Sequence, residues 1–194
     1  TAKFDRFDLD ASGWSISKAE CAAAYDALAP ELRDALNLAA DRIRAYHAAQ
    51  LPEDRDYRDA TGARLGARWN AVDAAGVYVP GGRAAYPSSV LMNVLPAKVA
   101  GVKEIVMVTP PGRDGSVSYP LALVAADLAG VDKIYKVGGA QGVAALVDLG
   151  EAGDQRVDLL EVAIAVGLVE RHAVLGQQRA AVVVGIADSR AADR

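Results

Sequence analysis

The chain has 194 residues, enough for one large domain or two small ones. Apolar residues make up 52% of it and charged residues 24%, so a sizeable hydrophobic core can form. The formal net charge of −4 argues against a nucleic-acid partner or an anionic membrane, either of which a basic patch would attract.

The N-terminal residues and the single cysteine bear on location. Residues 1–10 are polar and acidic and lack the pattern of a secretory signal, and no apolar run of about 18 residues could span a membrane. Cys21 has no partner for a disulfide within the chain. These features predict a cytoplasmic protein. Because free cysteines in helices are usually buried, Cys21 is interpreted as an apolar filler rather than a nucleophile.

Two helices are expected in residues 1–52. Ser17 and Glu20 match a capping box ahead of an alanine-rich helix. Pro30 suits the first turn of a second helix, which Pro52 should end. An apolar stripe at helical spacing follows this second helix and consists of Leu32, Leu36, Ala39, Ile43 and Tyr46. The stripe predicts a docking face, directed at either the rest of the chain or a partner subunit.

Strands and helices then alternate. Residues 53–63 are typical of a turn, and Leu65–Val72 is predicted to form a short strand. Further on, strands are expected at 77–79, 103–109 and 133–137, and helices at 88–100, 118–129 and 140–147. This order predicts an α/β fold with a helical arm followed by a parallel sheet with right-handed crossovers.

Three glycine-containing turns follow the predicted strands, where ligands bind in parallel sheets. They are Pro80-Gly81-Gly82, Pro110-Pro111-Gly112 and Gly138-Gly139-Ala140-Gln141. Glycine lets the backbone approach a ligand, and the N–H groups of a helix start favour an anion, so Gly138-Gly139 is either a nucleotide loop or an ordinary turn. Tyr78 could cover a nicotinamide-like ring or simply lie at the rim. Gln141 could hydrogen-bond a ligand or cap the helix.

Metal and acid–base signals are weak. His47 and His172 are the two histidines, and neither has a second ligand at helical spacing, so no metal site is predicted. His47 is interpreted as a helix-surface residue. Asp41 and Arg44 are interpreted as part of a solvated helix face. No Ser-His-Asp arrangement can be proposed.

Six motifs in order and at matching spacing resemble histidinol dehydrogenase. They are Gly76-Val-Tyr-Val-Pro-Gly-Gly82, Tyr86-Pro-Ser-Ser-Val-Leu-Met-Asn93, Pro96-Ala-Lys-Val-Ala-Gly101, Val108-Thr-Pro-Pro111, Ala129-Gly-Val-Asp132 and Val137-Gly-Gly-Ala-Gln141. The resemblance covers about residues 4–146. Each motif alone is modest, but the six in register are very specific to this family.

The resemblance implies the NAD-dependent oxidation of L-histidinol to L-histidine through the aldehyde, by zinc-containing homodimers with Rossmann-like domains. It also implies that Tyr78 and Gln141 match positions that contact NAD. Four glycines shape the same loops: Gly81, Gly82, Gly138 and Gly139. The residue-by-residue interpretation agrees, because these positions already lie on the ligand edge of the predicted sheet.

After Gln141 the resemblance fades. The family continues with a Gly-Pro-Gly-Asn loop, a Gln-x-x-His zinc pair, an adjacent Glu-His catalytic pair and further Asp and His zinc ligands, none of which is present. Residues 148–194 contain no lysine and no aromatic residue. Either the chain leaves the family's reading frame near Val147, or this segment is a divergent one. The expected divisions are a 1–52 arm, a 53–147 NAD-binding region and a 148–194 tail.

The leading hypothesis is therefore a truncated histidinol dehydrogenase that is inactive alone, with neither the catalytic pair nor the zinc ligands of the family. The alternative is a non-catalytic nucleotide-binding or dimerisation fragment. A third hypothesis is a misfolded product without function, because a half-covered parallel sheet would aggregate.

Overall fold

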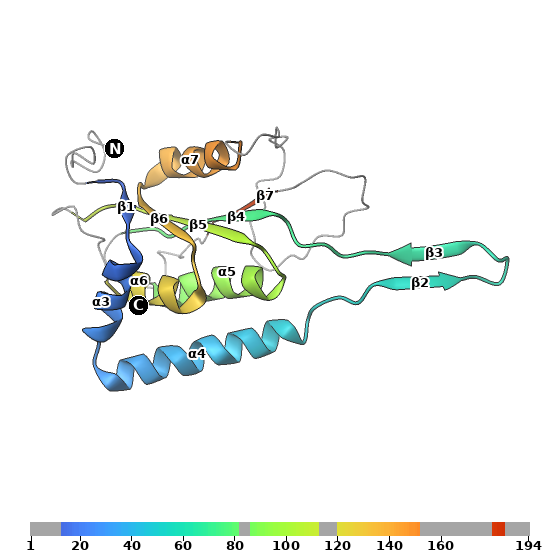
Figure 1. Cartoon of the computed structure of the whole chain (residues 1–194), viewed down its shortest axis with the longest axis horizontal. Coiled ribbons are helices and arrows are strands. Elements are labelled where there is room, and N and C mark those ends of the chain that lie inside the picture. The colour runs from blue at the N-terminus through green and yellow to red at the C-terminus, as the bar shows by residue number, and fades with distance from the viewer. Residues whose placement is uncertain (1–12, 82–85, 113–119, 152–179, 185–194) are drawn as a thin grey trace, which may run out of the picture.

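A five-stranded sheet forms the centre of the molecule (Figure 1). The computed structural model describes residues 13–81, 86–112, 120–151 and 180–184, the last of these and 147–151 only as backbone. The strand order across the sheet is β1 (Ser15–Ile16), β6 (Lys133–Lys136), β5 (Glu104–Thr109), β4 (Ala74–Tyr78) and β7 (Ala180–Val184).

The predicted parallel sheet is confirmed. β4 pairs in parallel with β5 and β7, and β5 pairs in parallel with β6, whereas β1 runs antiparallel to β6. Local sequence patterns do not predict the two edge strands. β1 has only two residues, and the short run Ala180–Val184 is too ambiguous to assign by periodicity.

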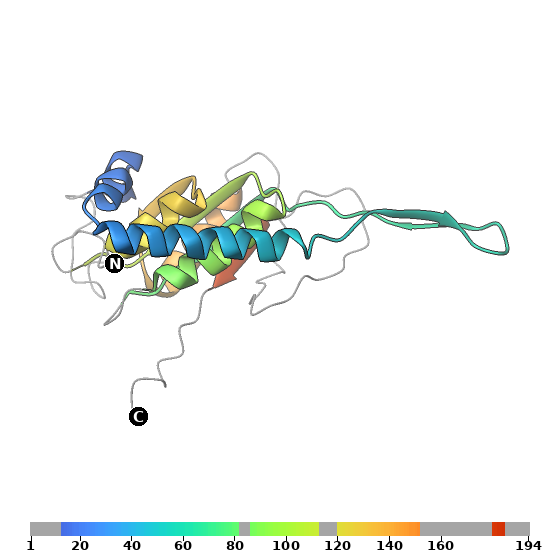
Figure 2. The same cartoon turned by 90° about the horizontal axis from the view of Figure 1, so that it is seen from below.

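Helices cover both faces of the sheet. α5 (Pro87–Val99) and α6 (Pro120–Ala129) lie on one face, with α3 (Lys18–Asp26) beside α6 and α4 (Pro30–Ala48) as an outer layer (Figures 1 and 2). α7 (Gly139–Glu151) lies alone on the opposite face among the described elements. None of the helices in the described ranges is both long and apolar enough to cross a membrane.

The predicted capping box begins α3. The Ser17 hydroxyl accepts a hydrogen bond from the Glu20 backbone N–H at 3.2 Å, and the Glu20 carboxylate accepts one from the Ser17 backbone N–H at 2.7 Å. α4 begins at Pro30 as expected. The expectation that Pro52 ends α4 is wrong, because the helix already ends at Ala48 and its last turn is closed by the N–H of Ala49.

The apolar stripe on α4 docks against the body of the same chain, but only over its middle. Leu36 is buried, and Ala39 and Ile43 pack partly against the core. The two ends are open, since Leu32 is 40% exposed and Tyr46 is 63% exposed. The own-body alternative is thus correct for the centre of the stripe.

The interpretation of Asp41 and Arg44 as part of a solvated helix face is wrong for Arg44, which also contacts α6. Its guanidinium donates to the Leu128 carbonyl near the end of α6 at 2.6 Å and pairs with Asp41 at 3.1 Å. A cation at a helix C-terminus satisfies a carbonyl that lacks an intrahelical partner. Arg44 therefore fastens the outer helix α4 to α6.

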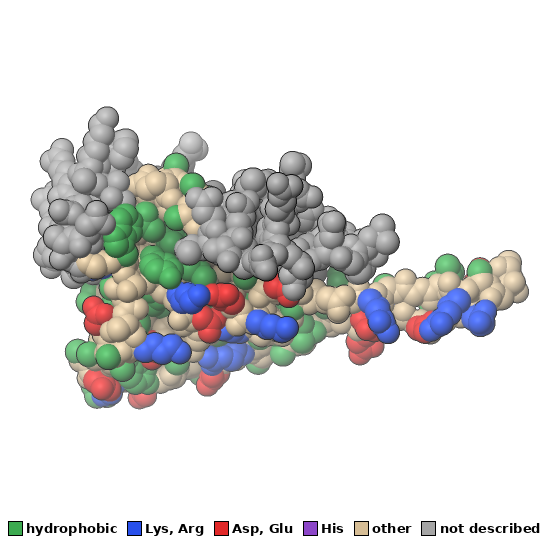
Figure 3. Space-filling view, turned by 45° about the horizontal axis from the view of Figure 1, so that its top comes forward, with side chains coloured by type: hydrophobic (Ala, Val, Ile, Leu, Met, Phe, Trp, Pro, Cys, Tyr) green, Lys and Arg blue, Asp and Glu red, His purple; other side chains and the backbone are tan. Residues whose placement is uncertain are grey.

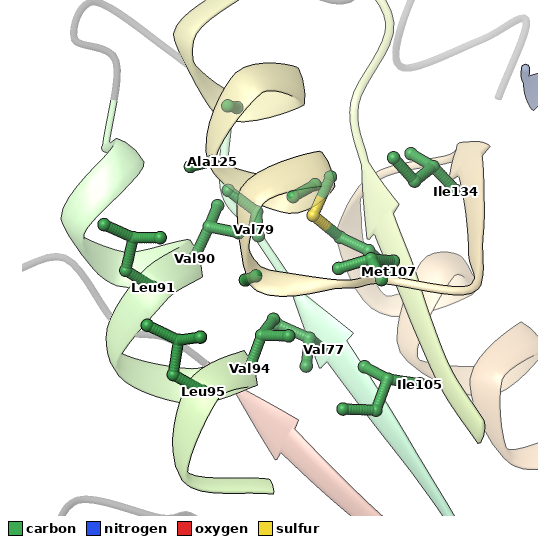
Figure 4. Packing of buried hydrophobic residues seen from close by; sticks show 14 of the residues in the cluster. Val77, Val79, Val90, Leu91, Val94, Leu95, Ile105, Met107, Ala125 and Ile134 are labelled. Carbon is green, nitrogen blue, oxygen red and sulfur yellow. The ribbon is translucent and has the colours of Figure 1, made fainter. Parts of the chain in front are cut away.

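The main core fills the space between α5, α6 and the sheet (Figure 4). Its fully buried members include Val90, Leu91, Val94 and Leu95 of α5, Val77 of β4, and Ile105 and Met107 of β5. Full burial of such side chains stabilises a fold by about 1.5–3 kcal/mol each. Cys21, Leu36 and Ala40 belong to the same cluster, so the N-terminal helices share this core.

Two glycines let α7 lie close to the sheet. A Cβ atom added to Gly76 of β4 would be 3.0 Å from Cδ1 of Leu146, and one added to Gly142 of α7 would be 3.0 Å from the Val137 carbonyl oxygen. Leu146 is buried there against a second, smaller cluster with Val106, Val108 and Val137. The first turn of α7 is consequently held at the end of β6.

An antiparallel hairpin, β2 (Arg55–Arg58) and β3 (Arg64–Ala67), projects away from the body (Figure 1). The predicted strand Leu65–Val72 is thus shorter than expected, and β2 lies in the segment interpreted as a turn. Both strands are exposed, so they lack the apolar alternation that identifies a half-buried strand. Acidic and basic side chains intermix along the hairpin (Figure 3), and Asp56 pairs with Arg64 across it.

Asp132 joins three elements at the amino edge of the sheet. Its carboxylate accepts hydrogen bonds from Lys98 Nζ of α5 and from the backbone N–H of Ile105 in β5, both at 2.8 Å. Burial raises the pKa of Asp132, but the two donors lower it by more, so the net pKa lies below its usual value. Ionised Asp132 therefore stabilises the fold above the unfolded-state pKa, and this contribution is lost as pH falls through the folded-state pKa.

We predict that Asp132→Asn lowers the free energy of unfolding by about 1 kcal/mol at neutral pH, because a neutral amide replaces the carboxylate that attracts Lys98 at a partly exposed site. Urea titrations at several pH values would measure the difference, which should shrink toward acidic pH. Asp34→Asn, at an exposed position of α4, is the control. A difference from the wild type that is the same at every pH would contradict the assignment.

Candidate functional site

Three loops meet at the carboxyl edge of the sheet, as the sequence predicts. β4, β5 and β6 are consecutive parallel neighbours in the sheet, so the turns that follow them emerge at one edge. These turns carry Gly81, Pro110 and Gly138. The remaining predicted glycine of the first turn, Gly82, lies outside the described residues.

The Pro110 ring lies between the glycines of the two outer loops. A Cβ atom added to Gly138 would be 2.5 Å from Cγ and 2.7 Å from Cβ of Pro110. One added to Gly81 would be 3.1 Å from Cγ and 3.2 Å from Cβ of the same ring. Only glycine allows this close approach at position 138. At position 81 a Cβ atom would be in tight contact with the Pro110 ring, which a small shift of either residue could relieve.

Three predicted site residues converge where α7 begins. The backbone N–H of Gly139 donates to the Tyr78 hydroxyl at 3.3 Å, which joins the end of β4 to the start of α7 across the intervening strand β5. Gly139 has a φ of +66°, a conformation that favours glycine. A Cβ atom added there would be 3.0 Å from Oε1 and 3.3 Å from Nε2 of Gln141, so the Gln141 amide lies over Gly139.

The geometry suits a phosphate-bearing ligand with an aromatic ring. The N–H groups of Gly139, Ala140 and Gln141 precede the first helical bond of α7, in which Gly142 N–H donates to the Gly138 carbonyl at 3.2 Å. Such N–H groups and the helix dipole favour an anion. The Tyr78 hydroxyl and the Gln141 amide add hydrogen-bonding groups. The described residues therefore fit a nucleotide at this edge.

A zinc ion does not fit the described residues. Within the ranges that the structure covers, no three His, Cys, Asp or Glu side chains are grouped as metal ligands. His47 lies on α4, where its ring meets that of Tyr46 edge-on with 5.2 Å between centroids, in keeping with a helix-surface role. His172 lies outside the described residues.

Cys21 is buried in the main core, with 3% of its surface exposed. Burial raises the pKa of its thiol, and the negative charges of Asp127 and Glu20 raise it further. The thiol is therefore protonated at neutral pH and is a poor nucleophile. The interpretation as an apolar filler agrees with this environment.

Sequence reasoning missed Pro110 as part of the site. The sequence places the Pro110-Pro111-Gly112 turn on the ligand edge of the sheet but gives Pro110 itself no role there. Its contact with both glycine loops depends on strand order, for which the sequence carries no local signal. Thr109 and Lys136, partners in register at the ends of β5 and β6, are likewise buried polar residues at this edge that periodicity did not single out.

Comparison with known proteins gives a family match over most of the chain. The family model of histidinol dehydrogenase matches residues 1–160. The chain belongs to the histidinol dehydrogenase family. The match extends past Leu146, where the resemblance seen in the sequence ends, and so reaches into the segment 148–194.

Individual relatives support the same assignment. The chain is 54% identical over 167 residues to histidinol dehydrogenase of Zymomonas mobilis subsp. mobilis, covering 86% of this chain and 37% of that protein. It is 59% identical over 146 residues to histidinol dehydrogenase of Bradyrhizobium diazoefficiens, covering 75% and 33%. The chain spans about a third of the length of the curated relatives it matches.

A solved structure shares the fold. The crystal structure of histidinol dehydrogenase from Elizabethkingia anophelis matches with a TM-score of 0.70 and 34% identity, covering 75% of this chain and 33% of that one. Histidinol dehydrogenase membership and a partial α/β fold relative to the family are thus established for this chain.

We predict that Cys21 is unreactive in the folded protein, because it is buried and its thiol is protonated at neutral pH. Titration with a chromogenic disulfide reagent should detect almost no thiol in buffer and one thiol per chain in denaturant. Rapid labelling of the native protein would show that Cys21, which lies on α3, is not packed in the main core in solution.

Proposed function

We propose that this chain forms the NAD-binding side of a histidinol dehydrogenase, which oxidises L-histidinol to L-histidine through the aldehyde. The observation that carries the proposal is the convergence of Tyr78, Gly139 and Gln141 at the start of α7. Family membership supports it, because the resemblance assigns NAD contacts to Tyr78 and Gln141.

Each residue has a distinct task in this proposal. The N–H groups of Ala140 and Gln141, in the first turn of α7, would donate to a phosphate oxygen of NAD. The Gln141 amide would hydrogen-bond the nucleotide, and the Tyr78 ring would cover one of its planar groups. Gly81 and Gly138, which have no side chain, would let the loops stay close enough for this approach. NAD, when bound, accepts the hydride that leaves the alcohol carbon.

The remaining chemistry needs groups that the described residues do not hold. A base must take the hydroxyl proton, and a water must be activated for the second oxidation. The described part of the chain has no zinc ligand set, so no step is assigned to zinc here. We therefore propose that these 194 residues alone bind NAD without turnover. We also propose a cytoplasmic location, as the sequence predicts.

A second candidate is a non-catalytic nucleotide-binding or dimerisation fragment. The exposed hairpin β2–β3 and the open ends of the α4 stripe favour it, since Tyr57 is 55% and Tyr46 is 63% exposed. Family resemblance implies a homodimer. Light scattering coupled to size-exclusion chromatography distinguishes a dimeric fragment from a monomer.

We predict that the purified chain binds NAD in a calorimetric titration and that Gln141→Ala raises the Kd by about 3- to 10-fold, since one or two hydrogen bonds are lost. Tyr78→Ala should weaken binding as well, because it removes a ring and a hydroxyl. Gln50→Ala and Tyr46→Ala, at exposed positions of the N-terminal region, are matched controls that should leave Kd unchanged.

The same sample with L-histidinol and added zinc should produce no NADH. Absorbance at the NADH band would measure this directly. Accumulation of NADH would show that the chain holds a complete active site, and a failure to bind NAD would remove the basis of the proposed function.

A further inference from the structure

Pro110 lies at the centre of the three loops, although neither family resemblance nor the sequence pattern gave it a role. It follows the central strand β5, and its ring is the nearest group to both Gly81 and Gly138. These two glycines follow β4 and β6, which do not pair with each other. Pro110 is therefore a shared spacer between two loops that have no direct strand pairing.

The contacts on the two sides of Pro110 differ in tightness. At Gly138 the added Cβ would also be 3.1 Å from the Pro110 Cα, so backbone as well as ring resists a side chain. At Gly81 the added Cβ would be 3.5 Å from Cδ, and all three near atoms belong to the ring. The rigid pyrrolidine ring cannot rotate away as a flexible side chain would. Neither glycine has a positive φ, so contact with Pro110 is what restricts both positions.

We propose that Pro110 is a positioning residue that sets the distance between the two glycine loops. Because Gly138 immediately precedes Gly139, the Pro110 contact fixes where the Gly139 N–H meets Tyr78 and where the Gln141 amide lies. The proposal rests on the proposed function, since these are the groups assigned to NAD. Pro110 acts through them and has no chemical role in the reaction.

Reciprocal substitution tests the proposal. Gly138→Ala introduces a methyl group against the ring and should raise the Kd for NAD by about tenfold or more, because binding groups must be held to within about half an ångström. Pro110→Gly removes the ring and its Cβ, so Gly138→Ala/Pro110→Gly should recover much of the lost affinity. Pro110→Ala keeps the Cβ and should rescue less. Gly81→Ala should have a smaller effect than Gly138→Ala.

Two controls separate positioning from general destabilisation. Pro111→Gly changes the neighbouring proline, which is not among the atoms closest to either glycine, and should not rescue Gly138→Ala. Asp132→Asn, at the opposite edge of the sheet, should lower the Tm without changing the Kd. Additive effects of Gly138→Ala and Pro110→Gly, or equal rescue by Pro111→Gly, would overturn the proposal.

A readout without ligand keeps the two proposals distinguishable. Amide hydrogen exchange at Gly139, followed by NMR, reports the Gly139–Tyr78 hydrogen bond directly. Exchange should accelerate in Gly138→Ala and slow again in the double variant. If the wild type fails to bind NAD, the proposed function is wrong, and this exchange pattern still decides whether Pro110 spaces the loops. Unchanged exchange in Gly138→Ala would refute the spacing.

Discussion

The parallel pairing of β4, β5 and β6 is the constraint from which the site follows. The carboxyl ends of parallel strands lie at the same edge of a sheet, so turns about 30 residues apart in sequence lie side by side. β5 separates the other two strands by one position. A contact between the two outer loops must therefore cross β5 or involve the residues at its end. The Tyr78–Gly139 hydrogen bond crosses β5, and Pro110, at the end of β5, contacts both loops.

The two edges of this sheet differ in chemistry. At the amino edge, Asp132 joins Lys98 to the start of β5, with its pKa held below its usual value, and Glu104 pairs with Lys133 nearby. These charged groups pair with one another within the fold. At the carboxyl edge, glycine and proline dominate, and backbone N–H groups at the start of α7 face outward from the helix end. The amino edge stabilises the sheet, and the carboxyl edge is suited to a ligand.

The chain belongs to the histidinol dehydrogenase family and spans about a third of the length of the relatives it matches. The described residues include the positions that we propose contact NAD and the core beneath them. They also include surfaces that the body leaves open: the hairpin β2–β3 and the outer ends of the α4 stripe.

Local sequence determined the elements whose signals are local. The capping box at Ser17, the glycine stops after α5 and α6, and the alternation of β4 to α7 all follow from capping, turn chemistry and periodicity, and six motifs in register identified the family. Tyr78, Gly139 and Gln141 could be named in this way, because each adjoins a strand end or helix start. Only the tertiary structure decided that they meet, that the exposed strand β2 forms, and that Pro110 separates two glycine loops. The convergence at α7 and the place of Pro110 depend on strand order and on close contact between distant segments, which no local pattern encodes. β2 was not predictable for another reason, because its exposed residues lack the apolar alternation of a half-buried strand.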